Sequence, residues 1–527
     1  AKEDLPLAKY PETVTVHLGG KMNPNAKIPK GMSFEDNSYT RLLKENLNIQ
    51  VVYDWTASTS DYDEKMSLCI GSNTIPEIMN VNATQYRALL KYDMIQPLDK
   101  YFDDYASDAL KSYVKSGGEE LQKCITNEDG ELMAIPAPNL TAGGVNEMWI
   151  RQDWLDALGL DVPRTWDELA EVAKAFVTRD PDGNGENDTI GILGPGNSDH
   201  MNAVGGNQFG LDPLFSCFQS YPQYWLKSED GSVEYGSIQP ETKTALENIS
   251  KLYADGVIDP ETLVRSDSKE PLLAGKVGIF FGPWWCAYTF ADTTLSGSAD
   301  WRAYFTPLSE DGKYYTHMAE PTTQYVVASK DCKNPEAAFK IINYLVANEQ
   351  KWVEEGVTST EMGTGDFYPL YNTYDNADEI ETSYEALTKY LAGDISMDDV
   401  DFSTHKLLKN DMEAVTKLKK KPYDDFSLKY WNLDSDLAKT NLPRLVAIMV
   451  GDAPLVNEEY VPVYNAYNGQ TETMEAKWAN LKKMEEETFA KIIMGKADIS
   501  EFDTFVKNWK NQGGDQILKE INDELSK

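Results

Sequence analysis

The 527-residue sequence is poor in the residues on which many enzymes and secreted scaffolds depend. Its five cysteines form no CxxC pair and show no regular spacing, which argues against a fold built on disulfides. Its four histidines are widely separated and include no HExxH pair, so a zinc site or a histidine-based triad would need distant segments. Neither a GxSxG elbow nor a GxxxxGK(S/T) phosphate loop is present. No motif therefore indicates nucleophilic, zinc-dependent or nucleotide-dependent catalysis.

Positive charge is also scarce, with 49 basic against 86 acidic residues and a formal net charge of −37. Such a field repels polyanions, which argues against nucleic acid and anionic membrane surfaces as partners. No apolar run approaches the ~18 residues that a membrane-spanning helix needs. Because the chain begins Ala-Lys-Glu-Asp without a methionine, we expect a processed product whose targeting segment has been removed.

The length predicts more than one domain, since single cores stop growing near ~250–300 residues. Strand patterns at 13–18, 49–53 and 77–81 alternate with helix patterns at 38–45 and 62–70, which indicates an α/β fold with a parallel sheet. Ligands of such sheets bind at the carboxyl ends of strands. That rule places Asp36, Asn37, Asp54 and Trp55 in the candidate region, and we nominate Glu35 with Asp36 and Asn37 by position. From about residue 380 the pattern is mainly helical.

Residues 180–191 have most of the features of a calcium-binding loop. Oxygen-bearing side chains fall at loop positions 1, 3, 5 and 9, and a glycine falls at position 6, where such loops turn sharply. Position 12, usually a bidentate glutamate, is Gly191, so a further ligand must come from elsewhere in the fold or from water. A polar surface turn without an ion is the alternative. The expected metal ligands are Asp180, Asp182, Asn184 and Asp188 through their side chains and Glu186 through its backbone carbonyl.

The sequence is rich in large aromatic residues, with 12 Trp and 29 Tyr. Sugar sites place flat rings against the C–H face of a pyranose, and burying such a face contributes about 2 kcal/mol. The hydroxyl rim then needs hydrogen bonds from polar side chains. Trp284 and Trp285 follow a predicted strand at 276–281 and a Gly-Pro turn, where rings can project into a site, although one of them can equally belong to the core. Weaker candidates for ring stacking are Tyr224, Trp225, Trp55 and Trp431.

Several segments resemble one family in the expected order along the chain. They are Trp149–Asp156 (WIRQDWLD), Pro163–Leu169 (PRTWDEL), Gly275–Trp285 (GKVGIFFGPWW), Asn334–Ala338 (NPEAA), Glu487–Gly495 (ETFAKIIMG) and Phe502–Val506 (FDTFV). The chain resembles the extracellular solute-binding proteins, family 1, of bacterial carbohydrate ABC transporters. With its length and calcium loop, it is similar to the long lipoprotein branch that includes alginate-oligosaccharide-binding proteins.

The resemblance implies two α/β lobes in a periplasmic-binding-protein-like fold, with a hinge and a helix-rich C-terminal part. The first lobe would comprise 1–138 and about 302–355, and the larger second lobe 139–301 and about 356–527, including the calcium loop. The implied protein is a monomeric, non-catalytic receptor of a Gram-positive bacterium. It would hold an oligosaccharide in the cleft between the lobes, deliver it to a membrane permease and carry a structural Ca²⁺. A lost lipid anchor would tether it outside the cell membrane.

Two other functions stay open at this stage. A glycosidase or lyase could use two of the 86 acidic residues as paired carboxylates, although nothing in the sequence singles out such a pair. A peptide- or polyamine-binding receptor on the same scaffold would suit the acidic composition, whereas the Gly-Pro-Trp-Trp element favours sugar.

Overall fold

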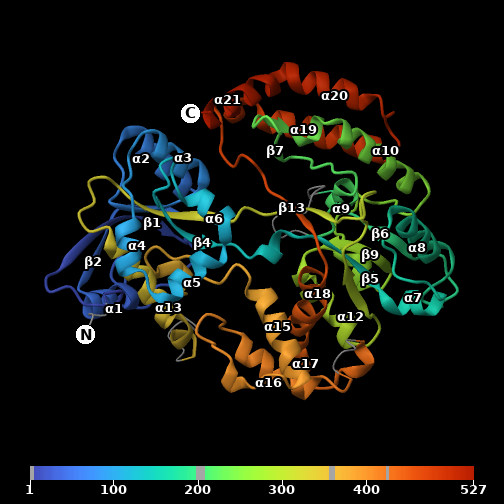
Figure 1. Ribbon diagram of the computed structural model, residues 1–527, viewed down its shortest axis with the longest axis horizontal. Helices are drawn as coiled ribbons and strands as arrows, with labels where there is room; N and C mark the ends of the chain where they lie inside the picture. The colour runs from blue at the N-terminus through green and yellow to red at the C-terminus, as the bar shows by residue number, and fades with distance from the viewer. Residues whose placement is uncertain (1–4, 198–207, 355–362, 423–426, 527) are drawn as a thin grey trace. The chain divides into compact units, whose positions relative to one another are not determined.

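The computed structural model describes residues 5–197, 208–354, 363–422 and 427–526. The chain divides into two compact units, each assembled from separate stretches of sequence. Unit 1 comprises Ala1–Leu140, Pro321–Asp378 and Asp401–Lys406, and unit 2 comprises Thr141–Glu320, Glu379–Val400 and Leu407–Lys527. Figure 1 shows the labelled elements of both. Among the described residues, no helix combines the length and the apolar character that crossing a membrane requires.

Unit 1 is built on a mixed sheet with the strand order β2-β1-β3-β12-β4. Strands β1, β2 and β3 are parallel, and β12 runs antiparallel to β3 and β4. The parallel sheet expected from the alternating pattern is therefore present, with an antiparallel half that the pattern did not show. The strands are β1 (Val14–Met22), β2 (Ile49–Ser58), β3 (Ile78–Val81), β4 (Ile135–Pro138) and β12 (Thr322–Ala328).

Helices surround this sheet and pack on it with their apolar faces. One continuous cluster contains buried side chains from the strands and from most of the helices. The helices are α1 (Ser38–Leu47), α2 (Tyr62–Ser72), α3 (Ala83–Lys91), α4 (Asp99–Tyr105), α5 (Asp108–Ser116), α6 (Gly118–Ile125), α13 (Glu336–Glu354) and α14 (Thr364–Phe367). Gly19 in β1 is needed for close packing, because a Cβ there would lie 2.5 Å from the Cζ2 atom of Trp55 on the neighbouring strand.

Unit 2 is built on a smaller mixed sheet with the order β10-β5-β9-β6. Strand β9 pairs antiparallel with β5 and parallel with β6, and β10 covers the other edge of β5. Short strand pairs lie outside this sheet. The strands are β5 (Glu147–Arg151), β6 (Ile190–Leu193), β7 (Trp225–Lys227), β8 (Val233–Tyr235), β9 (Val277–Gly282), β10 (Trp301–Tyr304), β11 (Tyr315–His317) and β13 (Val461–Val463).

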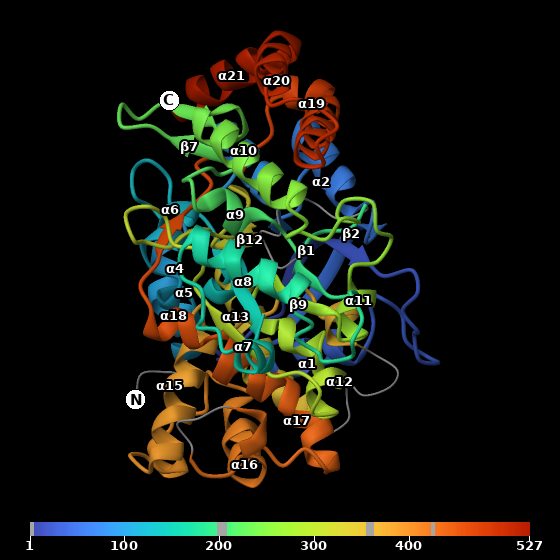
Figure 2. The same cartoon turned by 90° about the vertical axis from the view of Figure 1, so that its right-hand side faces the viewer.

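Two groups of helices in unit 2 lie at opposite ends of the unit in both views, and other helices lie between them around the sheet (Figures 1 and 2). The C-terminal group packs on α10, and the group around α16 and α17 packs on a π-helical turn, η6 (Ala447–Gly451). The helices are α7 (Gln152–Leu158), α8 (Trp166–Thr178), α9 (Asp212–Ser216), α10 (Pro240–Ala254), α11 (Lys269–Leu273), α12 (Ala291–Leu295), α15 (Glu379–Ala392), α16 (Leu408–Leu418), α17 (Asp436–Val446), α18 (Ala453–Asn457), α19 (Glu472–Ile493), α20 (Glu501–Trp509) and α21 (Asp515–Leu525).

Helix α8 is stabilised by a capping box at its start and by an apolar face that packs in the core. Thr165 is the N-cap residue, and its hydroxyl accepts a hydrogen bond from the Glu168 backbone while Glu168 reaches back to the cap. This reciprocal arrangement satisfies backbone donors that a helix start leaves unpaired. The buried face includes Leu169, Val172 and Phe176. A capping box and an apolar stripe therefore account for this helix.

The chain returns to unit 1 later than the sequence indicated. Strand β10, at residues 301–304, was expected in the first lobe, but it pairs with β5 and completes the sheet of unit 2. The return comes at Pro321, immediately before β12 enters the sheet of unit 1. Residues 363–378 then stay in unit 1, because α14 packs on β1 and Tyr368 belongs to the core of that unit.

Candidate functional site

A pocket with about 460 Å³ of space lies within unit 1, at the carboxyl ends of its parallel strands. Lys21 is the second-last residue of β1, Asn80 belongs to β3, and Asn139 follows β4 directly. Gln324 of β12 and Asn372 complete the polar part of the lining. A parallel sheet exposes unpaired backbone and divergent side chains at this edge, which is why α/β proteins place ligands there. The pocket lies at the edge of the sheet where the sequence analysis expected a site, but the residues that line it are not the nominated ones.

Two amide side chains in the pocket wall have unmet hydrogen-bonding capacity. The Nδ2 atom of Asn80 donates to the Oδ1 atom of Asn372 at 3.0 Å. The remaining amide atoms, Oδ1 of Asn80 and Nδ2 of Asn372, are buried and have no partner among the described residues. An unmet buried donor or acceptor costs about 1–3 kcal/mol. A hydroxyl group can both donate and accept, so it matches this pair.

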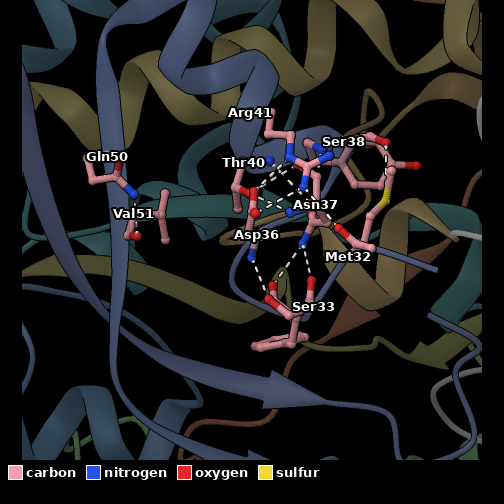
Figure 3. Close-up of polar contacts among 12 residues, drawn as sticks. Met32, Ser33, Asp36, Asn37, Ser38, Thr40, Arg41, Gln50 and Val51 are labelled. Atoms are coloured by element: carbon pink, nitrogen blue, oxygen red, sulfur yellow. Dashed lines mark hydrogen bonds and ion pairs between the residues drawn. The ribbon is translucent and has the colours of Figure 1, made fainter. Parts of the chain in front are cut away.

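Asp36 and Asn37 hold the start of helix α1 (Figure 3). The Oδ1 atom of Asn37 accepts from the backbone of Tyr39 and Thr40, and its Nδ2 atom donates to the Phe34 carbonyl at 2.8 Å. Asn37 is fully buried, whereas Asp36 is exposed and pairs with Arg41 at 2.7 Å. That guanidinium holds the pKa of Asp36 below its usual value. Both side chains therefore have structural partners. Glu35 is exposed.

In unit 2, Trp284 and Trp285 begin the short 3₁₀ helix η3 (Trp284–Tyr288) that follows β9 and Pro283. Trp284 is 6% exposed, and its indole Nε1–H is buried without a partner among the described residues. Trp285 is only partly buried. Trp284 is therefore the more deeply buried of the two rings.

A pair of buried carboxyl groups in unit 2 comes from strand β5 and from the residue that follows η6. Glu147 is opposite Gly282 in the β5–β9 ladder, and Asp452 follows Gly451, whose backbone packs against the Trp284 carbonyl. Both carboxyl groups are buried, and neither has a hydrogen-bond partner among the described residues. Burial raises the pKa of Glu147 well above its usual value, and the charge of Asp452 raises it further. Burial also raises the pKa of Asp452. These groups escaped the sequence analysis because 305 positions separate them in the chain.

The other predicted aromatic residues lie in packed surroundings. The Trp225 ring packs on Tyr235 with centroids 4.7 Å apart, and the Tyr224 ring meets His317 edge-on at 4.7 Å. Trp431 is 3% exposed and lies under the Lys419 ammonium. Trp55 packs on Tyr62 at 5.4 Å, and its Nε1–H is buried without a partner among the described residues.

The loop at 180–191 turns as its glycines predict. Gly183 and Gly185 have φ of 66° and 79°, and the Asp180 carboxylate accepts from the backbone of Asn184 and Gly185. Asp182 and Asp188 converge, because the Asn184 Nδ2 atom lies 3.0 Å from one carboxylate and 3.3 Å from the other. The Glu186 side chain is exposed, and the backbone amide of Glu186 donates to the Oδ1 atom of Asn184.

Position 12 of this loop has no room for a ligand side chain. A Cβ on Gly191 would lie 2.6 Å from the Val257 carbonyl oxygen and 2.8 Å from that of Ala173. The Lys276 ammonium instead approaches Asp188 at 2.5 Å and Asp182 at 3.5 Å. It holds the pKa of Asp188 below its usual value. Among the described residues, no three His, Cys, Asp or Glu side chains stand in a metal-holding arrangement. The oxygen-rich donor set nevertheless suits a hard cation, and its two converging carboxylates already hold a positive charge.

Comparisons with known proteins agree with these features. The fructooligosaccharide ABC transporter substrate-binding protein FusA of Streptococcus pneumoniae serotype 4 (strain ATCC BAA-334 / TIGR4) is 30% identical over 259 residues. That match covers 46% of this chain and 45% of FusA, about half of the relative's length. FusA has been solved with kestose (TM-score 0.51, 19% identity, 96% of this chain and 97% of FusA) and as an EF-hand mutant with fructo-nystose.

Two further similarities span nearly the whole chain. The polygalacturonan/rhamnogalacturonan-binding protein YtcQ of Bacillus subtilis (strain 168) is 24% identical over 515 residues, covering 95% of this chain and 92% of YtcQ. The crystal structure of the alginate-binding protein AlgQ2, solved without calcium ion, shares the fold with a TM-score of 0.52, 16% identity and full coverage of both chains. The two-lobed α/β class predicted from the sequence is thereby confirmed.

The family itself is identified by a match over residues 26–352, which is more than half of the chain and runs from α1 to most of α13. The resemblance inferred from the sequence motifs is confirmed. The chain belongs to the bacterial extracellular solute-binding protein family.

Proposed function

We propose that this protein is the substrate-binding component of a bacterial sugar importer and that it binds an oligosaccharide without altering it. Membership of the solute-binding family supports a receptor and gives no support to a hydrolase or lyase. The names of FusA and YtcQ describe carbohydrate-binding proteins. The observation that carries the proposal is the pocket of unit 1, whose wall holds the unmet amide atoms of Asn80 and Asn372. A ligand rich in hydroxyl groups is the chemical complement of that wall.

We propose Trp284 as the stacking residue of unit 2. Its indole Nε1–H is buried without a hydrogen-bond partner among the described residues, and the ring follows β9 after the Gly-Pro turn. Trp285 is the second candidate because part of its surface is open. Tyr224, Trp225 and Trp431 already pack on other side chains, and Trp55, Glu35, Asp36 and Asn37 stay predictions. Delivery to a permease, a monomeric state and a lipid anchor on the cell surface likewise stay predictions from the resemblance.

Replacing one amide side chain tests whether the pocket of unit 1 binds the oligosaccharide. A thermal-shift screen of plant, host and microbial oligosaccharides should reveal sugars that raise the melting temperature of the wild-type protein. The Asn80→Ala variant should bind such a sugar about tenfold more weakly, since about one hydrogen bond to the ligand is lost and Asn372 is left unpaired. Asn46→Ala is the control, because Asn46 is exposed on α1 and its side-chain amide donates to the Leu42 carbonyl of the same helix. Equal affinity in Asn80→Ala and the wild type would remove the pocket from the site.

We also propose that the loop at 180–191 holds a structural Ca²⁺. The oxygens of Asp180, Asp182, Asn184 and Asp188 and the carbonyl of Glu186 would hold the ion, and water would fill the position that Gly191 leaves without a ligand. The EF-hand mutant of FusA and the calcium-free form of AlgQ2 support a metal loop in this family. When bound, the ion would supply positive charge that fixes the end of α8 to the start of β6.

Removing calcium should lower stability by a small amount. Extracellular sites commonly have Kd near 10⁻⁴–10⁻³ M, and at about ten times Kd the bound ion adds only ~1.4 kcal/mol. Chelation should therefore lower the melting temperature of the wild type by a few degrees. It should leave that of the Asp180→Ala variant unchanged, because that variant has lost the first ligand. An identical melt of the wild-type protein with calcium and with chelator, and no metal in the purified protein, would contradict the proposal.

A further inference from the structure

The carboxylates that converge in the loop at 180–191 already have a cation from the protein itself. The Nζ atom of Lys276 lies 2.5 Å from Asp188 Oδ2 and 3.5 Å from Asp182 Oδ2. The Nδ2 atom of Asn184 is the other donor between them, at 3.0 and 3.3 Å. These are the side chains expected at metal-ligand positions 3, 5 and 9. A calcium ion there would need the same oxygen atoms that the ammonium occupies.

Lys276 is held beside the loop by its backbone. Its carbonyl oxygen accepts from the Ile190 amide at 2.8 Å, and the next residue, Val277, is the register partner of Ile190 in the parallel pairing of β6 with β9. Backbone pairing therefore holds Lys276 next to Ile190, at the end of the loop, whether or not the side-chain ion pair forms. The lysine side chain, 31% exposed, can leave the carboxylates while its backbone stays in place.

Two cations cannot share these two carboxylates at close range. A monovalent ammonium beside a divalent ion repels it, and each carboxylate oxygen bound to the lysine is lost as a metal ligand. Gly191 adds to this effect, because no side chain at position 12 can supply the missing negative charge.

We propose that Lys276 and calcium are alternative partners of Asp182 and Asp188. The lysine stabilises the loop when calcium is absent and is displaced when the ion binds, which weakens calcium affinity and lets the loop stay folded in both states. This inference rests on the proposed calcium site and assigns a residue of unit 2 that lies 88 positions or more from every proposed loop ligand in the sequence.

The Lys276→Met variant separates the two roles of the lysine. Calcium titration followed calorimetrically should give a Kd about tenfold lower than in the wild type, because the competing charge is gone. In chelator, the melting temperature of Lys276→Met should fall below that of the wild type, whereas in saturating calcium the difference should vanish or reverse. A merely structural lysine would lower the melting temperature equally in both conditions.

Two further variants complete the experiment. Lys276→Arg keeps the competing charge and should stay close to the wild-type Kd, and Lys251→Met, which removes a lysine from an exposed helical ion pair of the same unit, should change neither quantity. Equal calcium affinity in Lys276→Met and the wild type would overturn the displacement. Absence of calcium binding in every variant would instead overturn the proposed calcium site, so the two failures are distinguishable.

Discussion

Replacing Trp284 with alanine is expected to lower the affinity for the bound oligosaccharide at least tenfold. Stacking on one face of the indole contributes about 2 kcal/mol through apolar burial, and the variant loses all of that surface. The effect should exceed that of Trp285→Ala, because the Trp284 indole has a buried Nε1–H without a hydrogen-bond partner among the described residues. Isothermal titration of each variant with a sugar that stabilises the wild type gives the comparison.

The Trp284 experiment needs a check on folding, because removing a buried tryptophan costs about 3–5 kcal/mol of stability. Trp284→Phe keeps most of the apolar ring surface and loses the indole N–H, so it should retain the fold with an intermediate affinity. Trp166→Ala is the matched control, since Trp166 is a half-buried indole of the same unit that packs on Phe218 at 4.8 Å. Full affinity in both Trp284→Ala and Trp285→Ala would show that neither ring stacks on ligand.

The stability of the protein is expected to fall as the pH rises from about 4.5 to about 7, through the ionisation of Glu485. This carboxyl group is fully buried in α19 and accepts hydrogen bonds from Tyr235 at 2.6 Å and Ser237 at 2.5 Å. Burial raises its pKa to about 7. Between 4.5 and 7 the folded state therefore binds more protons than the unfolded state, so unfolding becomes easier as pH increases. Above about pH 7 the loss is complete and amounts to about 3 kcal/mol.

The Glu485→Gln variant tests this contribution. Glutamine resembles the protonated acid, so the variant should match the wild type near pH 4.5 and be more stable than it at pH 8. Denaturant unfolding at several pH values measures the difference. Glu487→Gln is the control, because Glu487 is exposed on the same helix. Wild type and Glu485→Gln curves that stay parallel from pH 4.5 to 8 would show that Glu485 is not protonated in the folded protein.

Local patterns predicted the elements of the fold well. The capping box at Thr165 and Glu168 and the apolar stripe of α8 depend only on neighbouring residues, so their geometry follows from short-range physics. The sharp turn at Gly185 is similar, because its position in the loop fixes the backbone that it must adopt. The capping role of Asn37 could have been predicted, since an asparagine before a helical pattern is a favoured N-cap.

Contacts between distant segments were beyond the reach of those patterns. The pocket of unit 1 joins residues 21, 80, 139, 324 and 372, none of which forms a motif with another. The boundary at Pro321 depends on the pairing of β10 with β5, which periodicity does not reveal. Trp225 was a candidate for ring stacking on ligand, but its ring packs against the rings of residues 235, 478 and 509, which are distant in the sequence.

The most direct measurement of the central claim combines binding with recovery of the ligand. A sugar found in the thermal-shift screen is titrated into the protein by calorimetry, released by unfolding and identified by mass spectrometry. The account predicts saturable binding and an oligosaccharide that is recovered with its length and linkages intact. New reducing ends or unsaturated products, or the absence of binding to any oligosaccharide in the screen, would contradict it.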